Sequence, residues 1–204
     1  MRYFRLPVIL FVLIPSSIFA EWSMDIRGVR LKSKPFVTIG MAAEMNKVET
    51  APAPPGYQCD MFVSDPEFPD DHLKTDIRPN NFQQEWILSI DPHGQDEPVP
   101  KSCSVSWNPS DLGQGYFQII DASSHPVIYD MKHDSSFTVT GIQKYQHFRI
   151  RHKQFLSLFD IIAALQLLTA APINQNAFFE DIDGDRQISQ KDILSMLQSI
   201  SQLN

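Results

Sequence analysis

This chain lacks the short motifs that mark common enzyme classes. It contains no G-x-S-x-G, no H-E-x-x-H and no glycine-rich phosphate loop. Asp121, Asp130 and Asp134 could supply an acid pair of the glycosidase kind, but they fall at expected hairpin turns, where aspartate bonds to neighbouring backbone. His125 and His133 flank an expected strand and are interpreted as surface residues. The sequence therefore predicts a protein without catalytic activity.

Basic residues and long apolar runs are scarce as well. The 17 Lys and Arg against 24 Asp and Glu leave a net charge of -7, which argues against nucleic acid or anionic membranes as partners. The apolar run Leu6–Ile14 is too short to span a membrane. It follows Arg2 and Arg5 and precedes Ala20, the pattern of an export signal cut before Glu21. We expect a secreted or cell-surface, extracellular protein with no membrane span.

Cysteine is also rare. The two cysteines are Cys59 and Cys103. In an oxidising compartment an even pair most simply forms a disulfide, which in the chain-entropy model restricts the unfolded state by roughly 4 kcal/mol. Two buried free thiols are the alternative. No C-x-x-C motif is present, so a redox or zinc-ribbon role has no support.

The segment Asp181–Asp192 reads D-I-D-G-D-R-Q-I-S-Q-K-D and has the spacing of a calcium-binding loop. Arg186 at the sixth place, usually glycine, and Asp rather than Glu at the twelfth indicate modest affinity. A solvated acidic loop with Asx-type turns is the alternative. The candidate ligands of Ca²⁺ are Asp181, Asp183, Asp185, the backbone carbonyl of Gln187, Ser189 and Asp192.

The middle of the chain alternates apolar and polar residues between frequent turn signals. In Ser102–Trp107 the apolar residues face one way and the serines the other, which is typical of a strand with one buried face. Short strands at this spacing predict an all-β sandwich. The expected strands are Phe36–Met41, Cys59–Val63, Trp86–Ile90, Ser102–Trp107, Tyr116–Asp121, Val127–Met131, Ser136–Thr140 and Phe148–Arg151.

Several acidic and aromatic residues can be assigned to the surface or to the core. The segment Asp65–Asp71 is interpreted as a surface loop. Trp86 and Trp107 alternate with apolar residues and are expected in the core. Trp22 and Tyr57 are the aromatic candidates for an exposed sugar-binding platform.

The tail contains an internal repeat with an offset of 32 residues. Ser157–Leu168 aligned with Ser189–Ile200 repeats Ser, Asp, Ile, Leu and Gln in step. Both copies have the spacing of amphipathic helices too short to hold alone in water, so we expect them to pack on each other. The facing stripes are expected to be Ile161, Leu165 and Leu168 in one copy and Ile193, Leu197 and Ile200 in the other.

The tail, about residues 155–204, resembles the dockerin family, in which a calcium loop leads directly into one helix and this EF-hand-like unit occurs twice. The resemblance implies that the six candidate ligands hold Ca²⁺ and that a cohesin-like protein or another cell-surface partner docks on the helices. The same offset puts Arg149, Arg151 and Lys153 where the first copy should carry acids, so only the second loop is expected to bind calcium. Asp160, the last position of the first copy, is expected to cap a helix.

The middle, roughly residues 36–151, resembles a β-sandwich module found near the carboxyl end of many large secreted bacterial proteins. This resemblance implies an immunoglobulin-like accessory domain without an enzymatic role. The residues that carry it are Ala51–Tyr57, Leu73–Pro79, Trp86–Leu88, Val105–Trp107, Tyr116–Asp121 and His147–Ile150.

Together these observations predict a mainly β protein with a small α domain, an immunoglobulin-like β-sandwich followed by a dockerin-like EF-hand helix pair. The expected organisation is an export signal over residues 1–20, the sandwich over 21–154 and the calcium-binding domain over 155–204. The expected function is structural calcium binding and protein–protein interaction. The alternative is a carbohydrate-binding protein or a component of a polysaccharide-degrading complex.

Thiol labelling tests the predicted bridge between Cys59 and Cys103. A bridged protein that is denatured without reductant takes up no label, because both sulfurs are already bonded. We expect mass spectrometry to show no adduct before reduction and labelling of both cysteines after it. Labelling of the denatured, unreduced protein would show two free thiols instead.

Overall fold

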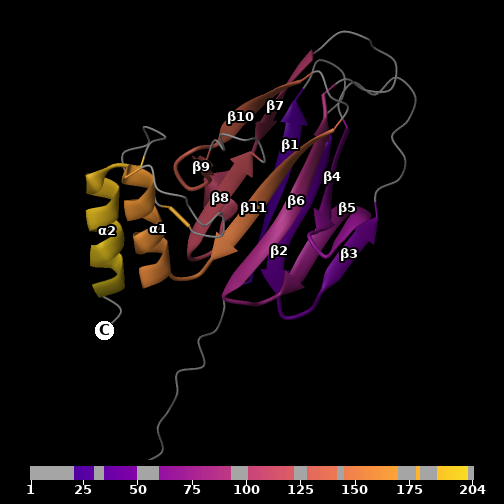
Figure 1. Ribbon diagram of the computed structural model, residues 1–204. Coiled ribbons are helices and arrows are strands. Elements are labelled where there is room, and N and C mark those ends of the chain that lie inside the picture. The colour runs from indigo at the N-terminus through magenta and orange to yellow at the C-terminus, as the bar shows by residue number, and fades with distance from the viewer. Residues whose placement is uncertain are drawn as a thin grey trace, which may run out of the picture.

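The computed structural model describes residues 21–29, 35–49, 60–92, 101–121, 128–141, 145–169, 178–179 and 188–201. They form a mainly β protein with two α-helices toward the carboxyl terminus, as the sequence predicted (Figure 1). The elements are β1 (Trp22–Val29), β2 (Phe36–Ala42), β3 (Asn46–Glu49), β4 (Asp60–Asp65), β5 (Phe68–Pro79), β6 (Gln83–Asp91), β7 (Lys101–Ser106), the 3-10 turn η1 (Pro109–Asp111), β8 (Tyr116–Asp121), β9 (Ile128–Asp130), β10 (Ser136–Gly141), β11 (Gln146–Lys153), α1 (Leu158–Leu168) and α2 (Gln190–Ser201).

The eleven strands of the described part of the chain form one curled, hydrogen-bonded sheet. Neighbours follow the order β10-β7-β1-β2-β5-β4-β6-β11-β8-β9, and β3 pairs with β5 beside this path. Strands β2 and β5 are parallel, whereas β5 pairs antiparallel with β4. The last residues of β5, Thr75–Pro79, pair with β2, and earlier residues pair with β4. This one long strand therefore joins the two halves of the sheet.

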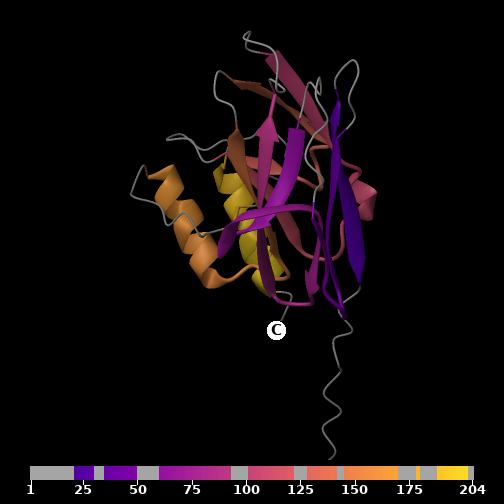
Figure 2. The ribbon, with the colours of Figure 1, turned by 90° about the vertical axis from the view of Figure 1, so that its right-hand side faces the viewer.

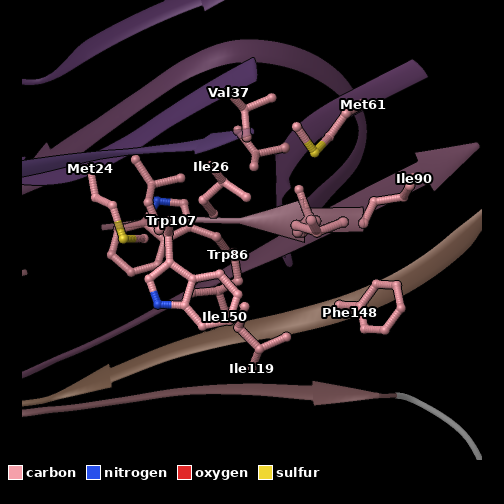
Figure 3. Close-up of a cluster of buried hydrophobic side chains, with 14 of the residues drawn as sticks. Met24, Ile26, Val37, Met61, Trp86, Ile90, Trp107, Ile119, Phe148 and Ile150 are labelled. Atoms are coloured by element: carbon pink, nitrogen blue, oxygen red, sulfur yellow. The ribbon is translucent and has the colours of Figure 1, made fainter. Parts of the chain in front are cut away.

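The sheet curls so that its two halves share one hydrophobic core, drawn in Figure 3. Ile26 on β1 and Trp86 on β6 are both fully buried in it. Trp22 on β1 stands edge-on to Phe117 on β8, with ring centroids 4.9 Å apart. Each large apolar side chain buried in this way contributes about 1.5–3 kcal/mol relative to exposure. This shared core holds the two halves of the sheet against each other.

The alternation of apolar and polar residues located most of the strands. Each expected strand has a counterpart, and β8 has the predicted bounds. Cys103, Val105 and Trp107 are buried while Ser102 and Ser104 are exposed, which confirms the alternation in that strand. Trp86 and Trp107 lie in the core, as predicted.

Three strands, β1, β3 and β5, were not predicted, and the expected loop Asp65–Asp71 is wrong in its second part. Residues 66 and 67 form a turn, after which β5 begins at Phe68. Asp70 and Asp71 belong to this strand and are exposed. Strand pairing of β5 is made by backbone groups, so the exposed acidic side chains give no indication that this segment is a strand.

A buried ion pair lies on the last part of β5. Arg78 donates from Nε and Nη2 to Oδ2 of Asp76, at 2.9 and 2.6 Å, and Asp76 is fully buried. The Nη1 group of Arg78 donates to the backbone oxygen of Glu85 at 2.7 Å. Nε1 of Trp86 donates to the backbone oxygen of Asp76 at 3.2 Å. These bonds fasten β5 to β6 at the junction of the two halves.

Replacement of Arg78 by alanine should destabilise the protein by about 3 kcal/mol or more, because the buried carboxylate of Asp76 would lose its cation. The matched control is Arg27→Ala, since the side chain of Arg27 is 66% exposed in its pair with Asp25. We expect that control to change the free energy of unfolding by less than about 1 kcal/mol. Denaturant unfolding measures both variants. Equal losses of unfolding free energy would show that burial does not determine how much the Arg78–Asp76 pair contributes to stability.

Candidate functional site

The helix pair is built on the internal repeat of the tail. Helix α1 begins at Leu158 and α2 begins at Gln190, at the same place in each copy of the repeat. In each copy the serine before the helix bonds to the aspartate on the first turn. Such bonds help to satisfy the backbone N–H groups that the start of a helix leaves open. We refer to these two serine–aspartate pairs as the first and second capping boxes.

The second capping box contains the last two predicted calcium ligands. The N–H and Oγ groups of Ser189 donate to Oδ2 of Asp192 at 2.8 and 2.6 Å. Asp192 is fully buried. The structure therefore brings these two side chains together. The remaining predicted ligands, Asp181, Asp183, Asp185 and Gln187, lie outside the described residues.

The first capping box surrounds a fully buried carboxylate, that of Asp160. Its Oδ2 atom accepts hydrogen bonds from the N–H and Oγ groups of Ser157, at 2.7 and 2.6 Å, and from Nζ of Lys153 at 2.5 Å. Its Oδ1 atom accepts the N–H group of Phe178 at 2.9 Å. Burial raises the pKa of Asp160, but these donors outweigh burial and hold it below its usual range. The predicted capping role of Asp160 is confirmed.

The basic residues of the first copy belong to a strand. Arg149, Arg151 and Lys153 are alternate residues of β11 and share one face of it. Arg149 pairs with Glu85 at 2.7 Å. The guanidinium of Arg151 lies 4.3 Å from the ring centroid of Phe178, and burial lowers the pKa of Arg151 to about 10. This basic face is where the helical tail meets the sheet.

The expected stripes between the helices are wrong at three positions. Leu165, Leu168 and Leu197 are 48%, 41% and 42% exposed. The bonds of Asp160 turn that side of α1 inward, and Leu165 lies outside the buried arc of the helix. The apolar helix residues that are buried are Ile161, Ala163 and Ala164 on α1 and Ile193 and Met196 on α2.

An exposed apolar surface therefore covers part of the helix pair. Leu158, Ile162 and Leu165 are spaced to lie on one side of α1. Leu194 and Leu197 of α2 occupy the same repeat positions as Ile162 and Leu165. Contiguous exposed apolar surface marks interaction sites more often than scattered residues do. We call the exposed residues Leu158, Ile162, Leu165, Leu194 and Leu197 the helix face.

The two helices lie together at one side of the sheet, next to β8, β9 and β11, and Figure 2 gives a second view of this arrangement. Their own hydrophobic cluster includes Phe178 and Phe179 and reaches Tyr116 of β8 and Ile128 of β9. The side-chain amide of Gln118 also donates to the backbone oxygen of Phe179. These contacts hold the tail on the outer face of the sheet.

Other predicted positions have local roles. Cys103 is fully buried on β7, whereas Cys59 lies outside the described residues, so their disulfide stays a prediction. Asp130 accepts the N–H of Lys132 at 2.9 Å and pairs with the exposed His133 at 3.0 Å. This is the local bonding at a turn that the sequence predicted.

Trp22 does not form the exposed sugar-binding platform for which it was one of two candidates. Its ring is only partly exposed and packs against the core beside Trp86 and Phe117. Gly113 makes room for it, because a Cβ atom there would lie 2.4 Å from the indole. The other candidate, Tyr57, lies outside the described residues.

A buried histidine was missed by the sequence reasoning. His152 is 3% exposed and packs against Phe117, with ring centroids 4.5 Å apart. Its Nε2 atom lies 3.0 Å from the backbone oxygen of Gln114. Burial lowers the pKa of His152. Its place on β11, two residues after the buried Ile150, was the signal available in the sequence.

Within the described ranges, no three His, Cys, Asp or Glu side chains gather to hold a metal ion. No helix in the same part of the chain has the length and apolar character needed to cross a membrane. Comparison of the chain with known proteins found no matching family model, no matching curated protein and no matching solved structure.

The protein should lose stability as the pH falls below about 6.5, the ordinary pKa of histidine. The lowered pKa of His152 means that the unfolded chain takes up a proton more readily than the folded one. Denaturant unfolding at pH 7.5 and 5.5 measures this loss. We expect His152→Gln to reduce the loss and His147→Gln, at an exposed site, to keep it. An unchanged pH dependence in His152→Gln would exclude His152 as its source.

Proposed function

We propose that this is an exported, non-catalytic protein whose tail binds one calcium ion and docks to another protein through the helix face. The observation that carries the proposal is the second capping box. It closes the twelve-residue acidic segment at the residue where a calcium loop would pass into its helix.

Electrostatics supports a structural role for the ion. The segment Asp181–Asp192 contains four aspartates, and carboxylates brought together in a calcium loop would repel one another until a divalent cation neutralises them. Helix α2 begins within the last three residues of that segment, so an ion held there also stabilises the start of the helix. Binding to the folded state alone adds about 2.7 kcal/mol at a hundredfold excess over the dissociation constant.

The helix face supports the docking role. Its residues are large and apolar, and their exposed fractions range from 42% to 64%. Two positions on α1 recur on α2 at the repeat offset, so each helix offers a pair of large apolar side chains at equivalent positions. A cohesin-like or other cell-surface protein with an apolar site is the partner class this face would fit.

We further propose that the sheet is an immunoglobulin-like accessory module that carries the tail. Two halves packed around one core, with β5 passing between them, support this. The dockerin-like description of the tail rests on the repeat and the two capping boxes.

Thermal unfolding with excess calcium and with chelator tests the calcium site. We expect calcium to raise the Tm of the wild-type protein by several degrees, since about 1 kcal/mol shifts the Tm of a domain this size by roughly 2–4 °C. Asp183→Ala should remove most of this shift because it deletes a predicted ligand. The control Glu44→Ala, an exposed acid outside the loop, should keep the shift. Equal Tm values with and without calcium would show that the segment Asp181–Asp192 is an acidic turn and not a calcium site.

A further inference from the structure

We infer that the ammonium of Lys153 stands in the first copy of the repeat where the proposed calcium ion would stand in the second. The offset of the repeat relates Lys153 to Asp185, at the fifth place of the calcium loop, and Asp160 to Asp192, at the twelfth. The first copy thus carries a cationic side chain, Lys153, where the second copy carries a predicted calcium ligand. In the first half of the helix pair, the chain itself supplies the cation that holds the capping box.

The contacts of Lys153 match those expected of a bound cation. Its Nζ atom lies 2.5 Å from Oδ2 of Asp160 and 3.2 Å from Oγ of Ser157. The equivalent groups in the second copy, Asp192 and Ser189, are predicted calcium ligands. An ammonium carries three N–H donors and a positive charge, so it can neutralise the carboxylate and also donate to the hydroxyl.

Burial makes this pairing important for stability. The side chain of Asp160 is fully buried, and that of Lys153 is 17% exposed. A carboxylate in such a site is costly without a partner. Arg149 and Arg151 share the face of Lys153 on β11 and pair with Glu85. A second cation from solvent would meet three positive charges there, and the carboxylates of Asp160 and Glu85 are already paired with them. The chain should therefore take up one calcium ion and not two.

The same carboxylate links the lysine to the proposed calcium loop. Oδ1 of Asp160 accepts the N–H of Phe178, and Phe178 precedes the first predicted ligand, Asp181, by three residues. The ring of Phe178 lies 5.6 Å from Nζ of Lys153. The lysine-held half thus holds Phe178, three residues ahead of the proposed loop in the sequence, and keeps α1 ordered without calcium. The inference rests on the proposed function only for the ion in the second copy.

Hydrogen exchange followed by mass spectrometry, with chelator throughout, tests the inference on the full-length protein. We expect amides of α1 in the wild-type protein to exchange at least about tenfold more slowly than those of α2. Lys153→Met, which keeps the apolar stem, should remove this protection. Lys153→Arg should keep most of it, because the charge remains. Lys74→Met is the matched control, since Lys74 is exposed on β5 and lies over Phe36.

A double variant separates charge pairing from a general loss of folding. Lys153→Met/Asp160→Asn removes the buried carboxylate that Lys153→Met leaves without its cation, so the protection of α1 should recover by about tenfold over Lys153→Met. Unchanged protection in Lys153→Met, or no recovery in the double variant, would overturn the inference. Failure of calcium binding in the wild-type protein would remove the proposed function yet leave these chelator results to decide the role of Lys153.

Discussion

The buried carboxylate of Asp160 is the interaction on which the tail depends. It lies where the last strand, the first helix and Phe178 meet, and its donors are Lys153 of the strand, Ser157 just before the helix, and Phe178. An effective cost of several kcal/mol for burying one ion is met here by a direct cation and three further hydrogen bonds. Because Asp160 must face Lys153, the rotation of α1 is set, and Leu165 is left in water. The exposure of the α1 side of the helix face thus follows from one buried charge.

The sheet uses a similar arrangement at its own junction. Asp76 and Arg78 are a buried pair on β5, the strand that joins the two halves. A fixed geometry matters there because β5 pairs with strands of both halves. The tail packs on the outer face of the sheet. There Phe178 covers Arg151 and Phe179 contacts Gln118, and both polar side chains are buried. The expected boundary between residues 154 and 155 is crossed by these contacts.

An asymmetric pair of half-sites follows from this arrangement. One copy of the repeat is held by a lysine, and the other is proposed to be held by calcium. A module of this kind would keep one helix in place at low calcium and order the other when the ion arrives. The helix face draws on both helices, so a partner that contacts both would bind best when calcium is present.

Local chemistry could be predicted from the sequence, because it depends on spacing alone. The alternation of apolar residues predicted eight strands, and the repeat offset predicted where both helices begin. The capping role of Asp160 followed from its place at the last position of the first copy, where a helix begins. Strand β1 has the same alternation, with Met24 and Ile26 buried, and was missed. The strands β3 and β5 escaped detection because backbone pairing with distant strands forms them, and exposed side chains such as Asp70 do not reveal that pairing.

What the sequence by itself determined is therefore the periodic content of the chain: which residues alternate, which recur, and where acids gather. Only the tertiary structure decided that Lys153 meets Asp160, that His152 is buried beside Phe117, and that Leu165 and Leu197 face water. These outcomes depend on the angle at which each element packs. That angle is set by contacts between residues far apart in the chain, which no local pattern contains.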